Sequence, residues 1–174
     1  DMSGSNVRVP TPSGFVRNGA TDLPGIRFDI IDQFIQSDCA GFRPENRFAV
    51  VGFSTTVIPN IGSTCQAGRL DSRANVGVQL DELRNIQDQE PLDPPTSMGS
   101  TVYTDGLDCA QGIISDHQNS LPAAERPRQN YNVMFLSDGV PTRSNADPLT
   151  NFSGVYSSVD AIVASGQGAA GASV

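Results

Sequence analysis

The 174-residue sequence contains no lysine and no tryptophan, and it has a single histidine. Without lysine the chain cannot form a Walker-type phosphate loop, a Schiff base or a Lys–Asn isopeptide bond. Its formal net charge of −8 disfavours nucleic acid and anionic membrane surfaces as partners, because both are bound through basic patches. No apolar run approaches the roughly 20 residues that a membrane-spanning helix needs. An acidic surface of this kind suits cation binding.

Cysteine is also scarce, with Cys39, Cys65 and Cys109 as an odd set that has no C-x-x-C spacing. This pattern disfavours a zinc site or a dithiol redox motif. One disulfide bond with one remaining thiol is expected in an oxidising compartment, and three reduced cysteines are the alternative. The residues alone leave both open.

The length predicts one domain, and its hydrophobic pattern alternates between helices and strands. Helical spacing of apolar residues predicts helices at residues 26–37, 72–86, 101–115 and 155–165. Nearly continuous apolar runs predict buried strands at residues 47–54 and 131–139, and residues 55–62 form a poorer strand whose proline suits a sheet edge. Residues 6–22 lack an apolar period and are expected to form a loop. This order predicts an α/β fold.

Three short stretches carry oxygen donors: "DMSGS" with Asp1, Ser3 and Ser5, "GST" with Thr101, and "LSDG" with Asp138. In an open α/β sheet the loops at the carboxyl ends of parallel strands lie along one edge, where ligands bind. Carboxylate and hydroxyl oxygens suit Mg²⁺, Mn²⁺ or Ca²⁺. We therefore expect these five residues to form one metal site.

These motifs resemble the D-x-S-x-S, Thr and Asp parts of the metal-ion-dependent adhesion site of von Willebrand factor type A domains. The resemblance covers nearly the whole chain, because "RFAVVGFS" and "NVMFLSDGVPT" are also similar to strands of that family. It implies a doubly wound, mostly parallel central sheet flanked by helices. It further implies that Ser3, Ser5 and Thr101 bind the metal directly and that Asp1 and Asp138 act largely through water. One coordination position would stay open for an acidic group of a partner.

The same resemblance implies where the cysteines lie and how much of the domain is present. In that fold Cys39 and Cys65 would both reach the edge opposite the metal, so a Cys39–Cys65 disulfide is expected, with Cys109 as a buried free thiol. The D-x-S-x-S loop would follow the central strand of the sheet. Residues 1–174 are therefore expected to be a single domain that is incomplete at both ends, lacking the first central strand and the last strand or strands.

The function implied by the resemblance is metal-dependent adhesion or protein binding, not catalysis. Such a module would be secreted or displayed on a cell surface, in bacteria, as part of a larger adhesin, pilus or filament. One alternative is an intracellular scaffold domain of the same family. Another is a haloacid-dehalogenase-type phosphatase with Asp1 as its nucleophile, although Ser3 stands where that family needs a second acid. Asp105 and Asp108 are expected to be structural, and His117 to be a surface residue.

Overall fold

The computed structural model describes residues 9–11, 14–16, 25–37, 41, 43–53, 65–89, 102–137, 148–167 and 172–173. Its main elements are four helices: α1 (Ile26–Gln36), α2 (Val76–Gln89), α3 (Tyr103–Ser120) and α4 (Pro148–Gln167). All four predicted helices are confirmed. The helix α2 begins four residues later than its apolar spacing predicts, because β4 and a short 3-10 helix, η4 (Arg73–Asn75), come first.

The described strands are short and form three separate pairs. Strands β3 (Arg47–Phe48) and β4 (Asp71–Ser72) are antiparallel, whereas β5 (Tyr131–Asn132) and β6 (Ala172–Ser173) are parallel. Strands β1 (Val9–Thr11) and β2 (Gly14–Val16) form an antiparallel hairpin. The prediction of a loop at residues 6–22 is therefore wrong at this hairpin, whose strands contain the β-favouring residues Val9, Thr11, Phe15 and Val16. The predicted strand at residues 55–62 lies outside the described residues.

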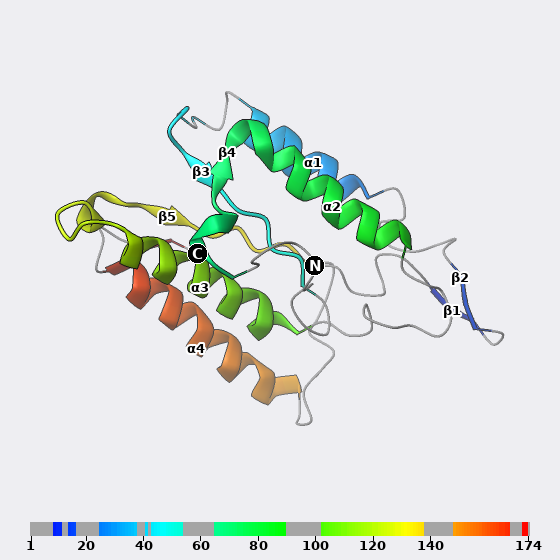
Figure 1. Ribbon diagram of the computed structural model, residues 1–174. Helices are drawn as coiled ribbons and strands as arrows, with labels where there is room; N and C mark the ends of the chain where they lie inside the picture. The colour runs from blue at the N-terminus through cyan, green and yellow to red at the C-terminus, as the bar shows by residue number, and fades with distance from the viewer. Residues whose placement is uncertain are drawn as a thin grey trace.

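The helices lie on two sides of the extended segments. Figure 1 shows α1 and α2 side by side on one side, and α3 and α4 on the other. The segments that continue from β3 and β5 run in the same direction between these two helix pairs. The molecule is thus a mixed α/β protein, as the sequence predicts, with small two-stranded sheets in the described residues.

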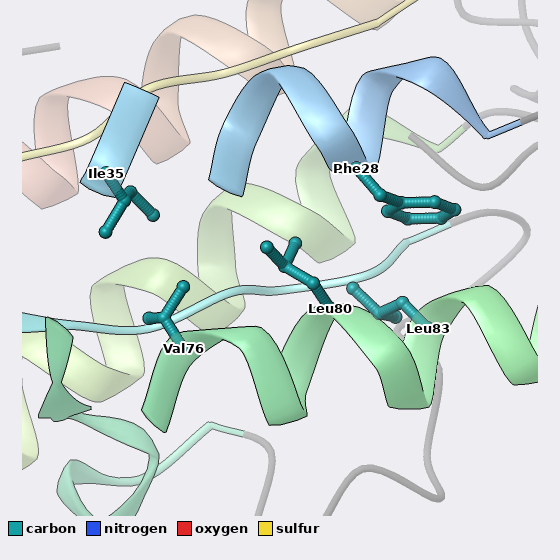
Figure 2. Close-up of a cluster of buried hydrophobic side chains, with 5 residues drawn as sticks. All are labelled: Phe28, Ile35, Val76, Leu80 and Leu83. Carbon is teal, nitrogen blue, oxygen red and sulfur yellow. The ribbon is translucent and has the colours of Figure 1, made fainter. Parts of the chain in front are cut away.

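One hydrophobic core joins α1 to α2. Its buried members are drawn in Figure 2: Phe28, Ile35, Val76, Leu80 and Leu83. Phe48 and Val50, from β3 and the residues after it, pack against this cluster. At the solvent side, Arg84 donates a hydrogen bond to the carboxylate of Asp29 at 2.5 Å and so links the two helices again.

A second core lies between α3 and α4. Its buried residues are Leu107 and Ile114 of α3 and Ile162 of α4. The segment after β5 supplies Val133 and Phe135, which pack against this cluster. The two cores share no residue, so each helix pair is packed against its own extended segment.

The disulfide bond joins Cys65 to Cys109, so the predicted Cys39–Cys65 pairing and the predicted free thiol at Cys109 are wrong. Cys65 precedes the 3-10 helix η3 (Ala67–Arg69), which lies against α3, the helix that carries Cys109. The backbone N–H of Ala67 donates to Asp116 of α3 at 2.6 Å. Gly112 allows this approach, because a Cβ atom there would lie 3.0 Å from the carbonyl oxygen of Cys65. Cys39 lies outside the described residues.

Candidate functional site

The five predicted metal ligands all lie outside the described residues. They are Asp1, Ser3, Ser5, Thr101 and Asp138. The described residues nevertheless include the chain beside two of them, at the start of α3 and at the end of the segment that follows β5. Within the described ranges, no group of three or more His, Cys, Asp or Glu residues could hold a metal ion.

The start of α3 and the end of the segment after β5 are joined by a hydrogen bond. The hydroxyl groups of Tyr103 and Ser137 lie 2.9 Å apart. Tyr103 is two residues after the predicted ligand Thr101, and Ser137 is one residue before the predicted ligand Asp138. Two segments that are 34 residues apart in the sequence thus meet beside the predicted site.

Three aromatic rings form a cluster at this meeting point. Phe53 and Phe135 are stacked with their centroids 5.0 Å apart, and Tyr103 packs edge-on against both rings. Such contacts favour a fixed relative position of the three segments that carry the rings. The sequence pattern does not predict this cluster. The available signal was that Phe53 and Phe135 stand near the ends of the two apolar runs, with Tyr103 at the start of the next predicted helix.

Glycine at position 106 permits the contact between Phe53 and α3. A Cβ atom at Gly106 would lie 2.8 Å from two ring carbons of Phe53, which is closer than real Cβ atoms come. The segment that ends at Phe53 can therefore lie directly on the first turns of α3. This position brings it beside Tyr103 and Phe135.

Other polar residues of α3 have structural roles. Asp108 accepts a hydrogen bond from Ser158 of α4 at 2.6 Å, which agrees with its predicted structural role. Asp105 lies in the first turn of α3, where an acidic side chain is favoured by the helix dipole. His117 is half-buried and hydrogen-bonded to the hydroxyl of Tyr131 at 2.7 Å, so it is not the surface residue that the sequence predicts.

A cavity of about 570 Å³ lies between the two extended segments. Its described walls are residues 47–51 and Phe53 on one side and residues 130–136 on the other, with apolar side chains of α1 and α3 completing them. Its volume is in the range of small-molecule pockets. Few polar side chains lie in these walls, and they belong to the first residues of the two segments: Arg47, Asn130 and Asn132 are examples. The other wall atoms are apolar side-chain atoms or backbone atoms.

Two pKa shifts accompany burial in the described structure. Burial raises the pKa of the Tyr131 hydroxyl, which lines the cavity. Burial also lowers the pKa of Arg69, while the nearby carboxylate of Glu82 opposes this effect across a 3.5 Å ion pair. Both shifts follow from the burial of the side chains.

The predicted ligands supply hydroxyl and carboxylate oxygens, which are hard donors that fit a divalent cation such as Mg²⁺. None of the described helices is long and apolar enough to span a membrane. No protein-family model, no curated protein and no solved structure matches this chain.

Proposed function

We propose that this protein is a metal-dependent adhesion or protein-binding module of the von Willebrand factor type A kind. Its metal, Mg²⁺ or a related divalent cation, is held by Asp1, Ser3, Ser5, Thr101 and Asp138. One coordination position accepts a carboxylate from a partner protein or surface. Neutral hydroxyl ligands leave the cation short of negative charge, so an incoming carboxylate is favoured.

The hydrogen bond between Tyr103 and Ser137 is the observation that carries this proposal. The metal site requires the chain at Thr101 and the chain at Asp138 to meet at one edge of the fold. The neighbours of these two residues do meet, and the stacked rings of Phe53 and Phe135 support the same contact. A protein in which α3 began at the other end of the 131–137 segment could not build such a site.

Two further observations support the proposed fold and location. The parallel strands β5 and β6 are connected through α4, which is the β-α-β arrangement that doubly wound sheets are made of. The Cys65–Cys109 disulfide bond favours an oxidising compartment. We therefore place the module outside the cell or on its surface, in a larger adhesin or filament, and regard it as a binding protein and not an enzyme.

Titration with Mn²⁺, followed by calorimetry or by electron paramagnetic resonance of the free ion, tests the metal site directly. We expect one ion per chain, displaced by excess Mg²⁺. The variants Asp138→Ala and Thr101→Val should each reduce the affinity at least tenfold. Asp160→Ala is the matched control, because Asp160 is an exposed carboxylate on α4 and should not affect binding. Equal Mn²⁺ affinity in all four proteins would refute the proposed site.

Adhesion itself is tested with surfaces that display carboxylate-rich proteins. Binding should require Mg²⁺, be abolished by EDTA, and be lost in Asp138→Ala but not in Asp160→Ala. Adhesion that persists in EDTA would contradict a metal-dependent mechanism even if the protein binds Mn²⁺.

A further inference from the structure

Tyr103 links the start of α3 to the segment after β5 through two contacts. Its ring packs edge-on against Phe135, with the two ring centroids 4.9 Å apart. Its hydroxyl group lies 2.9 Å from that of Ser137, two residues further along the same segment. One side chain of α3 therefore contacts this segment both through its ring and through its hydroxyl group.

The ring of Tyr103 is held by two other rings. Phe53 packs edge-on against it, with the centroids 6.2 Å apart, and is itself stacked on Phe135. Gly106, about one turn further along α3, leaves the room that Phe53 occupies. Edge-on and stacked aromatic contacts favour a defined relative orientation of the rings. The direction of the Tyr103 hydroxyl group is thus set by packing as well as by its hydrogen bond.

The helix α3 is itself fixed by contacts further along its length. The disulfide bond joins Cys65 to Cys109, and the backbone N–H of Ala67 donates to Asp116 at 2.6 Å. The second core holds the helix against α4. A shift of α3 along its axis would break these contacts. The Tyr103 ring therefore stands on a fixed base.

The hydrogen bond of Tyr103 lies close in the chain to two predicted metal ligands. Thr101 precedes Tyr103 by two residues, and Asp138 directly follows Ser137. Consecutive Cα atoms are about 3.8 Å apart, so each predicted ligand is joined to the bonded pair by a short tether. A bond that fixes the distance between Tyr103 and Ser137 therefore also limits the distance between Thr101 and Asp138.

The affinity of a metal site depends on how well its ligands are held in place. A hydroxyl group carries no net charge, so Thr101 can stabilise a cation only at short distance. Mutation of the residues that orient metal ligands typically lowers metal affinity about 10–100-fold. The bond between Tyr103 and Ser137 is exposed and acts through one or two peptide units, so its loss should have a smaller effect, about fivefold.

We propose that Tyr103 and Ser137 are positioning residues of the proposed metal site. Their hydrogen bond sets the separation of Thr101 and Asp138. It thereby sets the affinity for the metal and for the partner carboxylate that the metal binds. This inference rests on the proposed function. The two hydroxyl groups act as one unit through the bond between them, and neither is itself a metal ligand.

Mn²⁺ titration by calorimetry of Tyr103→Phe, Ser137→Ala and the double variant tests the pair. Tyr103→Phe keeps the packed ring and removes only the hydroxyl group. Each single variant should bind Mn²⁺ about fivefold more weakly than the wild-type protein. The double variant should bind no more weakly than either single variant, because both changes remove the same bond. Ser137→Thr keeps a hydroxyl group and should restore the wild-type affinity.

Tyr156→Phe and Ser120→Ala are the matched controls. Tyr156 is 66% exposed on α4, and Ser120 lies at the opposite end of α3 from Tyr103. The Ser120 hydroxyl donates a hydrogen bond to the carbonyl of His117 at 2.6 Å, so Ser120→Ala also removes a hydrogen bond. Both controls should keep the wild-type Mn²⁺ affinity. A fivefold loss in Ser120→Ala would assign the effect to general destabilisation and overturn the proposal.

Three other results would also overturn it. Unchanged Mn²⁺ affinity in Tyr103→Phe and Ser137→Ala, beside a loss in Asp138→Ala, would leave the metal site standing without its positioning pair. Losses that multiply in the double variant would mean that the two hydroxyl groups do not act through one bond. A loss in only one single variant would identify that hydroxyl group as a ligand. A wild-type protein that binds no Mn²⁺ would instead refute the proposed function, and this inference with it.

Discussion

Removal of the Cys65–Cys109 disulfide bond should destabilise the protein by about 4 kcal/mol. The two cysteines are 44 residues apart in the sequence. A crosslink that closes a loop of this length lowers the entropy of the unfolded chain by roughly 13 cal/mol/K, which is ~4 kcal/mol at 25 °C. Cys109 is buried, so alanine is the better replacement, because serine would place an unpaired hydroxyl group in the core.

Urea denaturation measures this change. With an m-value of about 2 kcal/mol/M, typical of small proteins, the midpoint should fall by about 2 M in Cys109→Ala. Reduction of the wild-type protein should give a similar shift, and Cys109→Ala should show no further effect of reductant. Cys39→Ala is the matched control and should leave the midpoint unchanged under both conditions.

A tryptic map under non-reducing conditions checks the pairing itself. Arg47 separates Cys39 from Cys65, and Arg69 separates Cys65 from Cys109, so the three cysteines fall on different peptides. A linked pair of the Cys65 and Cys109 peptides is expected. The structural pairing would be refuted by a linked Cys39–Cys65 pair together with a destabilised Cys39→Ala variant and an unaffected Cys109→Ala variant. Such a result would support the Cys39–Cys65 disulfide bond that the family resemblance implies.

Three further predictions concern packing, hydrogen bonding and pH. Gly106→Ala should destabilise the protein by about 1–3 kcal/mol in urea denaturation, because its Cβ would collide with Phe53. Gly77→Ala is the control: it lies in open space on α2 and should stabilise the protein by about 0.5–1 kcal/mol. Equal effects of the two substitutions would contradict the close contact. Ser158→Ala should cost about 1 kcal/mol through loss of its hydrogen bond to α3, and an unchanged melting temperature would argue against that bond. Burial raises the pKa of Tyr131, so above about pH 10 the folded chain still keeps the hydroxyl proton that the unfolded chain has lost. The free energy of unfolding should therefore fall as the pH rises above about 10. Tyr131→Phe should remove this part of the pH dependence.

The helices could be predicted from the sequence because a period of 3.6 residues leaves a strong pattern in the apolar residues. Ile35 and Leu80, for example, were both on predicted apolar faces and both are buried in the first core. Helix ends were less accurate. Before α2, residues Asp71 and Ser72 pair with β3, and this contact between distant segments leaves no local signal.

The disulfide pairing could not be derived from spacing, because it depends on which loop packs on which helix. The resemblance placed Cys39 and Cys65 at one edge of an assumed sheet. In the structure Cys65 instead leads into η3, which is held to α3 by the hydrogen bond from Ala67 to Asp116. The partner of His117 was missed for the same reason, since Tyr131 reaches it only after β5 is in place beside α3.

The apolar run at residues 131–139 predicts a strand buried on both faces, whereas the described strand is only Tyr131–Asn132 and one face of the segment that follows it is exposed. Val133 and Phe135 already pack into the second core, so the sequence period is correct on one face. Met134 and Leu136 line the cavity and are 60% and 41% exposed. The apolar pattern alone therefore identifies the face that packs into the second core, but it does not predict the exposure of the opposite face.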